Sequence, residues 1–361
     1  MNRRLPFWTA LPLLIATLGC ATGGHRVEPI ARDVPLPTST PQAEGMDPAV
    51  FASISQQIAD AGRHKLHSFL VLRHGRVVFE EYYNGYTRDT PHDLRSATKS
   101  ITSLLLGIAI DRAVVADVAA PAAQYLAAAY PDRRLSPAIT LRHLLTMSSG
   151  LDCDDRDRHT RGQEDRMYRS RDWVDYFLAL DQVDTPGERT RYCTGGVVAL
   201  GAVITQAAAQ PVDAFAEQQL FAPLGIANYR WARFDRNTQI DTGGHLLLTP
   251  QGLARIGLLV LNDGVWNGRR IVSERWIRES TAVQGAVDQN PYGYLWWIDE
   301  VPYGSVTVRV ITARGNGGQV LFIVPDYDLV AVATAGYFND PRSAVPYSIF
   351  YGAVLPQVLE L

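Results

Sequence analysis

Strand-like segments occupy both ends of this 361-residue chain, and helix-like segments fill the middle. A β-hairpin pattern covers residues 68–83, and three β-rich runs separated by turn residues follow between 305 and 336. Residues 113–284 carry apolar side chains mostly at helical spacing. The simplest architecture is an α/β (α+β) fold, in which both chain ends build one antiparallel sheet flanked by helices and a mostly helical lobe is inserted. We therefore assign 45–112 and 285–361 to an α/β lobe and 113–284 to a helical lobe.

The first 44 residues differ from the rest of the chain. Two arginines precede an apolar stretch too short to span a bilayer, so residues 1–20 are predicted to be a signal peptide. Cys20 follows a glycine as in a bacterial lipoprotein cleavage site, although Thr17 stands where leucine is usual. Cleavage without lipidation of Cys20 is the alternative. Residues 21–44 are rich in proline and small polar residues and are predicted to be a flexible tether, so we expect an exported, periplasmic, membrane-anchored lipoprotein.

The composition restricts the partners of the chain. Hydrophobic residues make up 47%, charged residues make up 20%, and the net charge is −3 without a block of basic residues. This balance argues against nucleic acid as a partner, and it leaves the N-terminal anchor as the expected membrane contact. Residues 156–171 alternate arginines with acids and are interpreted as a solvated loop.

A serine and a lysine lie one helical turn apart at the start of an apolar run, in LRSATKSITSLLLGIAID. Lys65 and Lys99 are the only lysines among the 34 basic residues. On a helix, Ser96 and Lys99 point the same way, and burial beside the positive helix N-terminus would lower the pKa of Lys99. A neutral lysine can accept the serine proton and so activate it as a nucleophile, which arginine cannot do. A serine N-cap followed by a surface lysine is the alternative.

Several motifs, in order, resemble those of the serine hydrolases of the β-lactamase and penicillin-binding protein superfamily. LRSATKSITSLLLGIAID resembles the helix that carries the nucleophile, and ITLRHLLTMSSGLD resembles the signature that follows it. PGERTRYCTGGVVALGAVI is similar to the second catalytic box, Tyr-x-Asn, while YGYLWW and ARGNGGQVLFIVPDYDLVAVAT resemble the closing sheet. The chain looks most like the class C-type branch, which includes esterases, D-amino-acid-specific peptidases and 6-aminohexanoate-dimer hydrolases. The resemblance implies a β-lactamase/transpeptidase-like fold.

The same resemblance implies catalytic roles for three residues. Ser96 would be the acylated nucleophile and Lys99 its base partner. Tyr192 would relay a proton to the leaving group or share the base role, whereas taken alone it is interpreted as a packed aromatic residue. No metal or other cofactor is implied.

The glycine-rich segment near the C-terminal strands is expected to complete the site. The resemblance implies an oxyanion hole from the backbone amides of Ser96 and Asn316. Gly315 and Gly317 would let the backbone approach the substrate closely.

Two positions depart from the family pattern. Thr194 stands where the second box usually has asparagine, and a hydroxyl offers less than an amide for substrate recognition. The third box begins with Ala313, where a charged residue is usual, which leaves Arg314 as a candidate for binding a substrate carboxylate. These changes put β-lactam and peptidoglycan-type recognition in doubt.

Cys153 and Cys193 are expected to form a disulfide, because an exported chain meets oxidising conditions and both cysteines adjoin motifs. Two buried free thiols are the alternative. The loop over 153–171 is expected to cover the cleft, with Asp165 and Tyr168 near the substrate.

The leading hypothesis is a serine hydrolase that cleaves a small-molecule ester or amide through an acyl-enzyme. Neither a Gly-x-Ser-x-Gly elbow nor a His-Glu-x-x-His metal motif is present. A β-lactamase or D-amino-acid peptidase is an alternative within the same fold. A non-catalytic cell-envelope binding protein is the alternative from another class, and the changed residues Thr194 and Ala313 favour it slightly.

Overall fold

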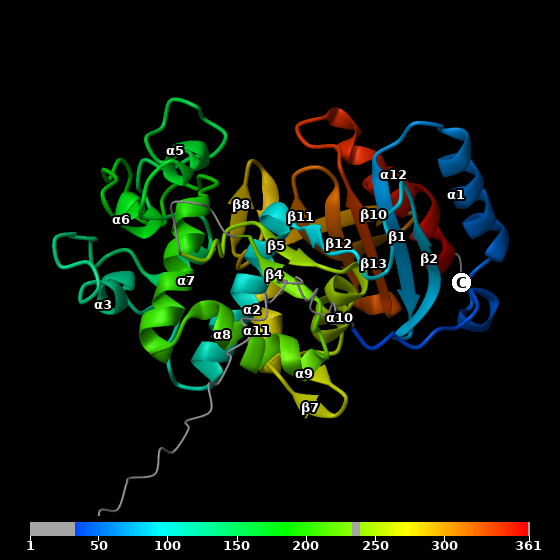
Figure 1. Cartoon of the computed structure of the whole chain (residues 1–361), viewed down its shortest axis with the longest axis horizontal. Helices are drawn as coiled ribbons and strands as arrows, with labels where there is room; N and C mark the ends of the chain where they lie inside the picture. The colour runs from blue at the N-terminus through cyan, green and yellow to red at the C-terminus, as the bar shows by residue number, and fades with distance from the viewer. Residues whose placement is uncertain (1–32, 233–238, 360–361) are drawn as a thin grey trace, which may run out of the picture. The chain divides into compact units, whose positions relative to one another are not determined.

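An antiparallel sheet built from both ends of the chain dominates the structure, a computed structural model that describes residues 33–232 and 239–359. Its strand order is β2-β1-β13-β12-β11-β10-β9-β8 (Figure 1). The strands are β1 (Leu66–Arg73), β2 (Arg76–Tyr82), β8 (Gly285–Val287), β9 (Asn290–Tyr292), β10 (Trp297–Tyr303), β11 (Val306–Gly315), β12 (Gln319–Val324) and β13 (Leu329–Ala335). Since β1 pairs with β13, the N-terminal hairpin extends the C-terminal strands, and the predicted fold class is confirmed.

Helices from both chain ends cover one face of the sheet. They are α1 (Pro48–Asp60), η5 (Pro341–Ala344), α12 (Val345–Ile349), η6 (Phe350–Val354) and α13 (Pro356–Leu359). The Asp47 carboxylate caps α1 by accepting from the Ala49 N–H at 2.8 Å. Phe350 stacks on Phe322 of β12 with ring centroids 4.0 Å apart, so the last helices and the sheet share a core.

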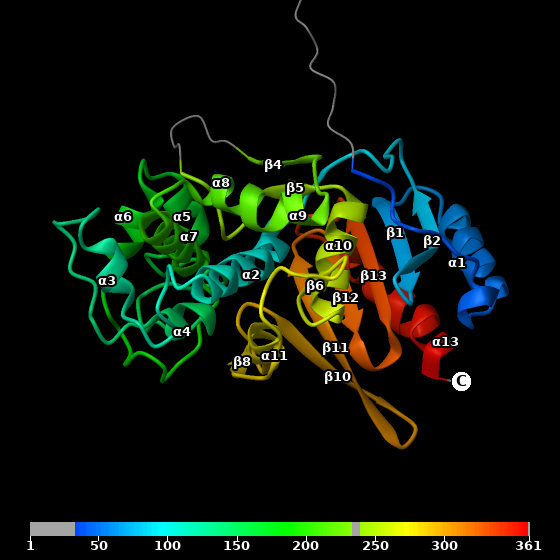
Figure 2. The same ribbon diagram turned by 90° about the horizontal axis from the view of Figure 1, so that it is seen from below.

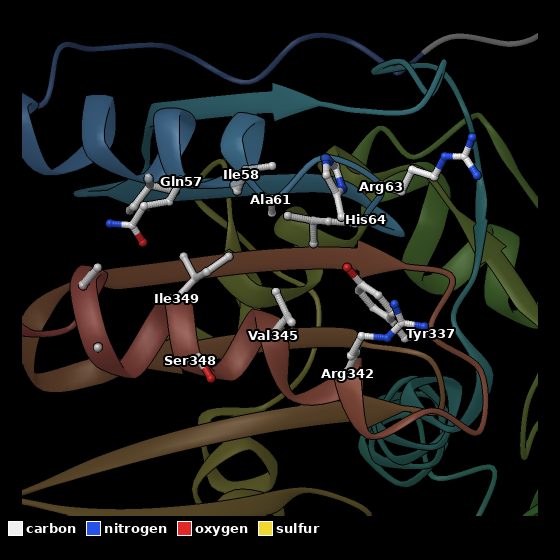
Figure 3. Close-up of a pocket in the computed structure, with 14 residues that line it drawn as sticks. Gln57, Ile58, Ala61, Arg63, His64, Tyr337, Arg342, Val345, Ser348 and Ile349 are labelled. Carbon is white, nitrogen blue, oxygen red and sulfur yellow. The ribbon is translucent and has the colours of Figure 1, made fainter.

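A cavity of about 610 Å³ lies between α1 and the C-terminal helices (Figure 3). Its walls include the apolar side chains of Ile58, Val345 and Ile349, and Arg63 and Arg342 lie at one end. The core cluster around this cavity is separate from the one that contains the helix after Ser96. The cavity is therefore not part of the candidate site described below.

The other face of the sheet is covered by α2 (Thr98–Asp111) and α10 (Pro250–Leu261), which lie on the opposite side from α1 and α13 in Figure 2. Twelve of the 14 residues of α2 are buried, because the helix runs between the sheet and the inserted lobe. One hydrophobic core extends from β12 through α2 to α7 (Thr194–Ala208). The two predicted lobes therefore share a core.

The inserted region is mostly helical, as predicted. Its further helices are α3 (Ala122–Leu126), α4 (Leu141–Leu145), α5 (Glu164–Tyr168), α6 (Trp173–Leu178), α8 (Val212–Ala216), η3 (Glu217–Phe221), α9 (Ala222–Leu224) and α11 (Glu274–Thr281). Its short strands are β4 (Tyr229–Trp231), β5 (Leu246–Leu248), β6 (Val265–Trp266) and β7 (Arg269–Arg270). β5 pairs with β3 (His92–Asp93), which leads directly to Ser96.

The structure shortens the expected tether, because residues 33–44 are bound to the domain. The Asp33 carboxylate accepts from the Thr249 hydroxyl and from the Ala227 N–H at 2.7 Å, and Leu36 is buried in the main core. Residues 42–44 form the helical turn η1 (Gln42–Glu44). The signal peptide, Cys20 and the start of the tether lie outside the described residues.

Among the described residues, no single helix has the length and apolar composition needed to cross a bilayer. Two consecutive helices, Thr194–Ala208 and Val212–Leu224, meet the length and composition requirements only when they are counted together, and they are bent by 79° relative to each other.

Candidate active site

Ser96 lies in a one-turn 3-10 helix, η2 (Arg95–Ala97), that continues directly into α2. The preceding residue, Arg95, has a φ of 50°, in the left-handed region that non-glycine residues rarely adopt. Its backbone N–H donates to Asp93 Oδ1 at 2.9 Å, and its guanidinium pairs with the same carboxylate at 3.2 Å. These contacts hold a strained turn immediately before Ser96, and such strain is concentrated at functional sites.

Lys99 lies one turn after Ser96 and is almost fully buried, with 1% of its surface exposed. Its Nζ donates to Ser96 Oγ at 3.1 Å, to Thr194 Oγ1 at 2.9 Å and to the Gly243 carbonyl at 2.6 Å. An ammonium group has three hydrogens to donate, and these three acceptors use all of them. The geometry therefore fits a protonated lysine that holds the Ser96 hydroxyl.

Carboxylates from three separate segments surround this lysine. Asp155 Oδ2 accepts from the Thr194 N–H at 2.8 Å and from the Thr194 hydroxyl at 2.7 Å. Glu164 Oε2, from α5, lies 3.2 Å from the same hydroxyl oxygen. Asp241 is buried and accepts from the Tyr168 hydroxyl at 2.8 Å. The site thus combines one buried ammonium group with three carboxyl groups.

The groups around Lys99 reverse the expected direction of its pKa shift. Burial alone lowers the pKa of Lys99, but the electrostatic interactions with Tyr192, Asp155, Glu164 and Asp241 outweigh it, so the pKa is raised. The expectation of a lysine with a lowered pKa is therefore wrong, because it considered burial and the helix N-terminus without these acids. Burial raises the pKa of Asp155 to about 7, although the positive charge of Lys99 opposes the shift.

Tyr192 lies beside the ammonium group, half-buried at the entrance to α7. Lys99 Nζ is 4.9 Å from the centroid of its ring, and the Arg156 guanidinium carbon is 5.2 Å from it. The Tyr192 ring also stacks on Trp297, with centroids 6.0 Å apart. The structure therefore brings Ser96, Lys99 and Tyr192 together, in agreement with the sequence motifs.

Cys153 and Cys193 form the expected disulfide, with their Cα atoms 5.4 Å apart. The Asp155 N–H donates to the Tyr192 carbonyl at 2.8 Å, so residues 153–155 and 192–194 run side by side. The disulfide thus ties the loop that carries Asp155 to the segment that carries Tyr192 and Thr194.

The end of β11 contacts the turn that carries Ser96. A Cβ atom on Gly315 would lie 2.1 Å from the Leu94 carbonyl oxygen, so only glycine permits this approach. The Asn316 side chain donates to Asn339 Oδ1 at 2.7 Å and accepts from the Asn339 backbone N–H at 3.0 Å. Gly317 has a φ of 95°, which glycine adopts without strain. The oxyanion hole from the amides of Ser96 and Asn316 stays a prediction.

Arg314 is engaged by neighbouring groups of the sheet. Its guanidinium pairs with Asp299, donates to Thr312 Oγ1 at 2.8 Å and lies 5.2 Å from the centre of the Trp297 ring. Ala313 is buried. A role for Arg314 in binding a substrate carboxylate stays a prediction. In that role the guanidinium would have to bind the substrate in addition to Asp299 and Thr312, or in place of them.

The sequence interpretation missed the acids around Lys99. Glu164 belongs to the charged stretch 156–171 that was interpreted as a solvated loop, Asp155 immediately precedes that stretch, and Asp241 lies in no recognised motif. The one available signal was the position of Asp155, two residues after a cysteine expected to reach Cys193. Tyr168 is hydrogen-bonded to Asp241 rather than free to meet a substrate, and Asp165 is exposed. Within residues 33–232 and 239–359, no group of three or more His, Cys, Asp or Glu side chains is placed to hold a metal ion.

Comparison with known proteins shows which family the chain resembles over most of its length. The family model of the beta-lactamases matches residues 51–349. The chain is 26% identical over 320 residues to the 6-aminohexanoate-dimer hydrolase of Paenarthrobacter ureafaciens, in an alignment that covers 80% of this chain and 76% of that protein.

Two solved structures are similar in fold at 16% sequence identity. The penicillin binding protein from Bacillus halodurans has a TM-score of 0.66, with 85% of this chain and 99% of that chain covered. EstCE1, a hydrolase with promiscuous acyltransferase activity, has a TM-score of 0.70, with 87% and 99% covered. Because the family model spans most of the sequence, the chain belongs to the β-lactamase family of hydrolases.

Proposed function

We propose that this chain is a serine hydrolase that cleaves a small-molecule ester or amide through an acyl-enzyme on Ser96. The observation that carries the proposal is the 3.1 Å hydrogen bond from the buried Lys99 ammonium to Ser96 Oγ, with the Tyr192 ring beside the same ammonium group. The similarity to a 6-aminohexanoate-dimer hydrolase supports an amide substrate, and EstCE1, a hydrolase with promiscuous acyltransferase activity, shares the fold.

In the proposed reaction, Tyr192 rather than Lys99 removes the Ser96 proton, because Lys99 already holds its own. Tyr192 is the candidate for this role because Lys99 Nζ, which donates to Ser96 Oγ, lies 4.9 Å from the centroid of its ring. Ser96 Oγ then attacks the substrate carbonyl carbon, and the amides of Ser96 and Asn316 stabilise the oxyanion. Tyr192 returns the proton to the departing alcohol or amine. Water then hydrolyses the acyl ester and releases the acid.

Labelling with a fluorophosphonate probe tests the nucleophile directly. Wild-type protein is expected to be labelled and to hydrolyse p-nitrophenyl acetate, and Ser96→Ala is expected to lose both. Equal labelling of Ser96→Ala, or no labelling of wild type, would exclude the hydrolase and favour the non-catalytic cell-envelope binding protein. Ser148→Ala, which removes the hydroxyl of another serine outside the candidate site, serves as the control.

A substrate panel separates the finer alternatives. Short esters, D-amino amides, linear oligoamides and a chromogenic cephalosporin are compared at equal enzyme concentration. Thr194 and Ala313 depart from the family pattern at substrate-reading positions, so we expect turnover of esters or linear amides and little turnover of the cephalosporin. Preferred cleavage of the cephalosporin or of D-amino amides would identify the β-lactamase or peptidase alternative instead.

We also propose export, with lipidation of Cys20 as the membrane anchor; the layout of residues 1–20 alone supports this. Metabolic labelling with a clickable fatty acid is expected to mark the wild-type chain in membranes. Cys20→Ser is expected to lose the label. A chain that is exported and unlabelled would favour simple cleavage of the signal peptide.

A further inference from the structure

The Thr194 hydroxyl lies between Lys99 and two carboxyl groups, and it has a single hydrogen to donate. Its oxygen accepts from Lys99 Nζ at 2.9 Å, so its own hydrogen must point to a carboxylate. Asp155 Oδ2 is 2.7 Å away and also accepts the Thr194 backbone N–H at 2.8 Å, whereas Glu164 Oε2 lies at 3.2 Å. Asp155 therefore accepts from both donors of Thr194 and fixes the side-chain rotamer.

We propose that Asp155 is a positioning residue of the reaction, which acts through Thr194 on Lys99. By accepting the Thr194 hydrogen, Asp155 turns a lone pair of Thr194 Oγ1 toward Lys99 Nζ. Lys99 is then held within hydrogen-bond distance of Ser96 Oγ, and the Thr194 oxygen shares its ammonium charge. This inference rests on the proposed hydrolase function and adds to it a role that no sequence motif assigns.

The chain holds Asp155 at this place by connections independent of its side chain. The Cys153–Cys193 disulfide and the hydrogen bond from the Asp155 N–H to the Tyr192 carbonyl join the same two segments. A carboxylate is not needed to keep these segments together.

The carboxylate of Asp155 is also buried at a cost in free energy, and the connections described above do not depend on it. Its Oδ1 is out of contact with solvent and has no hydrogen-bond partner among the described residues. Burying an unpartnered carboxylate oxygen is unfavourable, and such groups are typical of functional positions. Glu164 and Lys99 are the charged groups that face it, from α5 and α2.

The experiment compares second-order rate constants for fluorophosphonate labelling of Ser96. Asp155→Ala and Thr194→Val are each expected to lower the rate constant about 100-fold, the effect of misplacing a catalytic group by about an ångström. The double variant is expected to be no slower than either single variant, because both changes break one chain of contacts. Thr194→Ser keeps the hydroxyl and is expected to restore labelling to near the wild-type rate. Asp154→Asn removes a charge from the same loop and is the matched control, expected to label normally.

Three outcomes would overturn the proposal while leaving the hydrolase function intact. They are wild-type labelling of Asp155→Ala, multiplicative losses in the double variant, and equal losses in Thr194→Ser and Thr194→Val. If Asp155→Ala does not fold, as judged by circular dichroism, the Thr194 pair still decides the question. Wild type that is not labelled at all would instead overturn the proposed function, and this inference with it.

Discussion

The Cys153–Cys193 disulfide provides the most direct test of how the site is held together. The two cysteines are 40 residues apart, and closing a loop of that length in the unfolded chain removes about 13 cal/mol/K of entropy. At 25 °C this corresponds to a stabilisation of about 4 kcal/mol, which the double substitution Cys153→Ala/Cys193→Ala would remove. The loop closed by the disulfide contains α5 and α6, so loss of the disulfide should destabilise the lobe that carries Glu164.

Urea unfolding at 25 °C, followed by tryptophan fluorescence, measures this loss. Trp173 lies inside the loop and is fully buried, so its emission reports on the affected region. The double variant is expected to unfold at lower urea concentration, with a free energy of unfolding about 4 kcal/mol below that of wild type. Wild type refolded with the disulfide reduced should behave in the same way. Every protein in the series carries Cys20→Ser, which removes the remaining cysteine.

Activity should respond less than stability. The hydrogen bond from the Asp155 N–H to the Tyr192 carbonyl and the two contacts of Asp155 with Thr194 do not involve sulfur. While the double variant remains folded, fluorophosphonate labelling should therefore continue. A loss of less than about 1 kcal/mol with an unchanged denaturant slope would refute the chain-entropy reasoning. Abolished labelling in a folded variant would show that the other contacts do not hold the site.

Three further substitutions test separate parts of the site. Lys99→Arg should slow labelling by roughly 10²-fold or more, because the guanidinium cannot repeat the three contacts of the ammonium group; near-normal labelling would contradict this. Gly315→Ala should lower the free energy of unfolding in urea by about 1–3 kcal/mol, because its Cβ meets the Leu94 carbonyl; unchanged stability would show that β11 can move. Asp155→Asn should change the pH dependence of stability. The pKa of Asp155 is raised from 3.8 to about 7, so the folded chain keeps a proton that the unfolded chain loses, and wild-type stability falls as pH rises from about 4 to about 7. Asp155→Asn should lack this pH-dependent loss of unfolding free energy, which is no more than about 4 kcal/mol in wild type. Identical pH profiles of the variant and wild type would exclude a raised pKa of Asp155.

The sequence predicted the sheet because its strands carry their own signals. The hairpin expected over 68–83 appears as β1 and β2, and α7 lies within the region 113–284 where the apolar residues have helical spacing. The same spacing extends over α8 and α9, but a π-helical turn, η3, separates these two helices at 217–221. Apolar periodicity cannot detect that change, because the extra residue of a π turn shifts the hydrogen bonds and leaves the apolar composition unaltered.

The end of the tether was harder to predict, because its composition gives no sign of the contacts that residues 33–44 make with the domain. Residues 33–44 contain prolines and small polar residues, which favour an extended linker. Asp33 nevertheless binds Thr249 and the backbone at Ala227, and Leu36 enters the core. These partners lie about 200 residues away, so local sequence could not reveal them.

The pKa of Lys99 shows why a motif can predict that two side chains lie close together without specifying their charge. Ser96 and Lys99 are three residues apart, so one helical turn suffices to bring them together. The pKa of Lys99, by contrast, depends on Tyr192 and on Asp155, Glu164 and Asp241, which come from separate segments of the chain. Burial lowers this pKa, and the interactions with these four groups together raise it. In the mechanism that we propose, Lys99 keeps its proton and orients Ser96, and Tyr192, whose ring centroid lies 4.9 Å from Lys99 Nζ, is the candidate base.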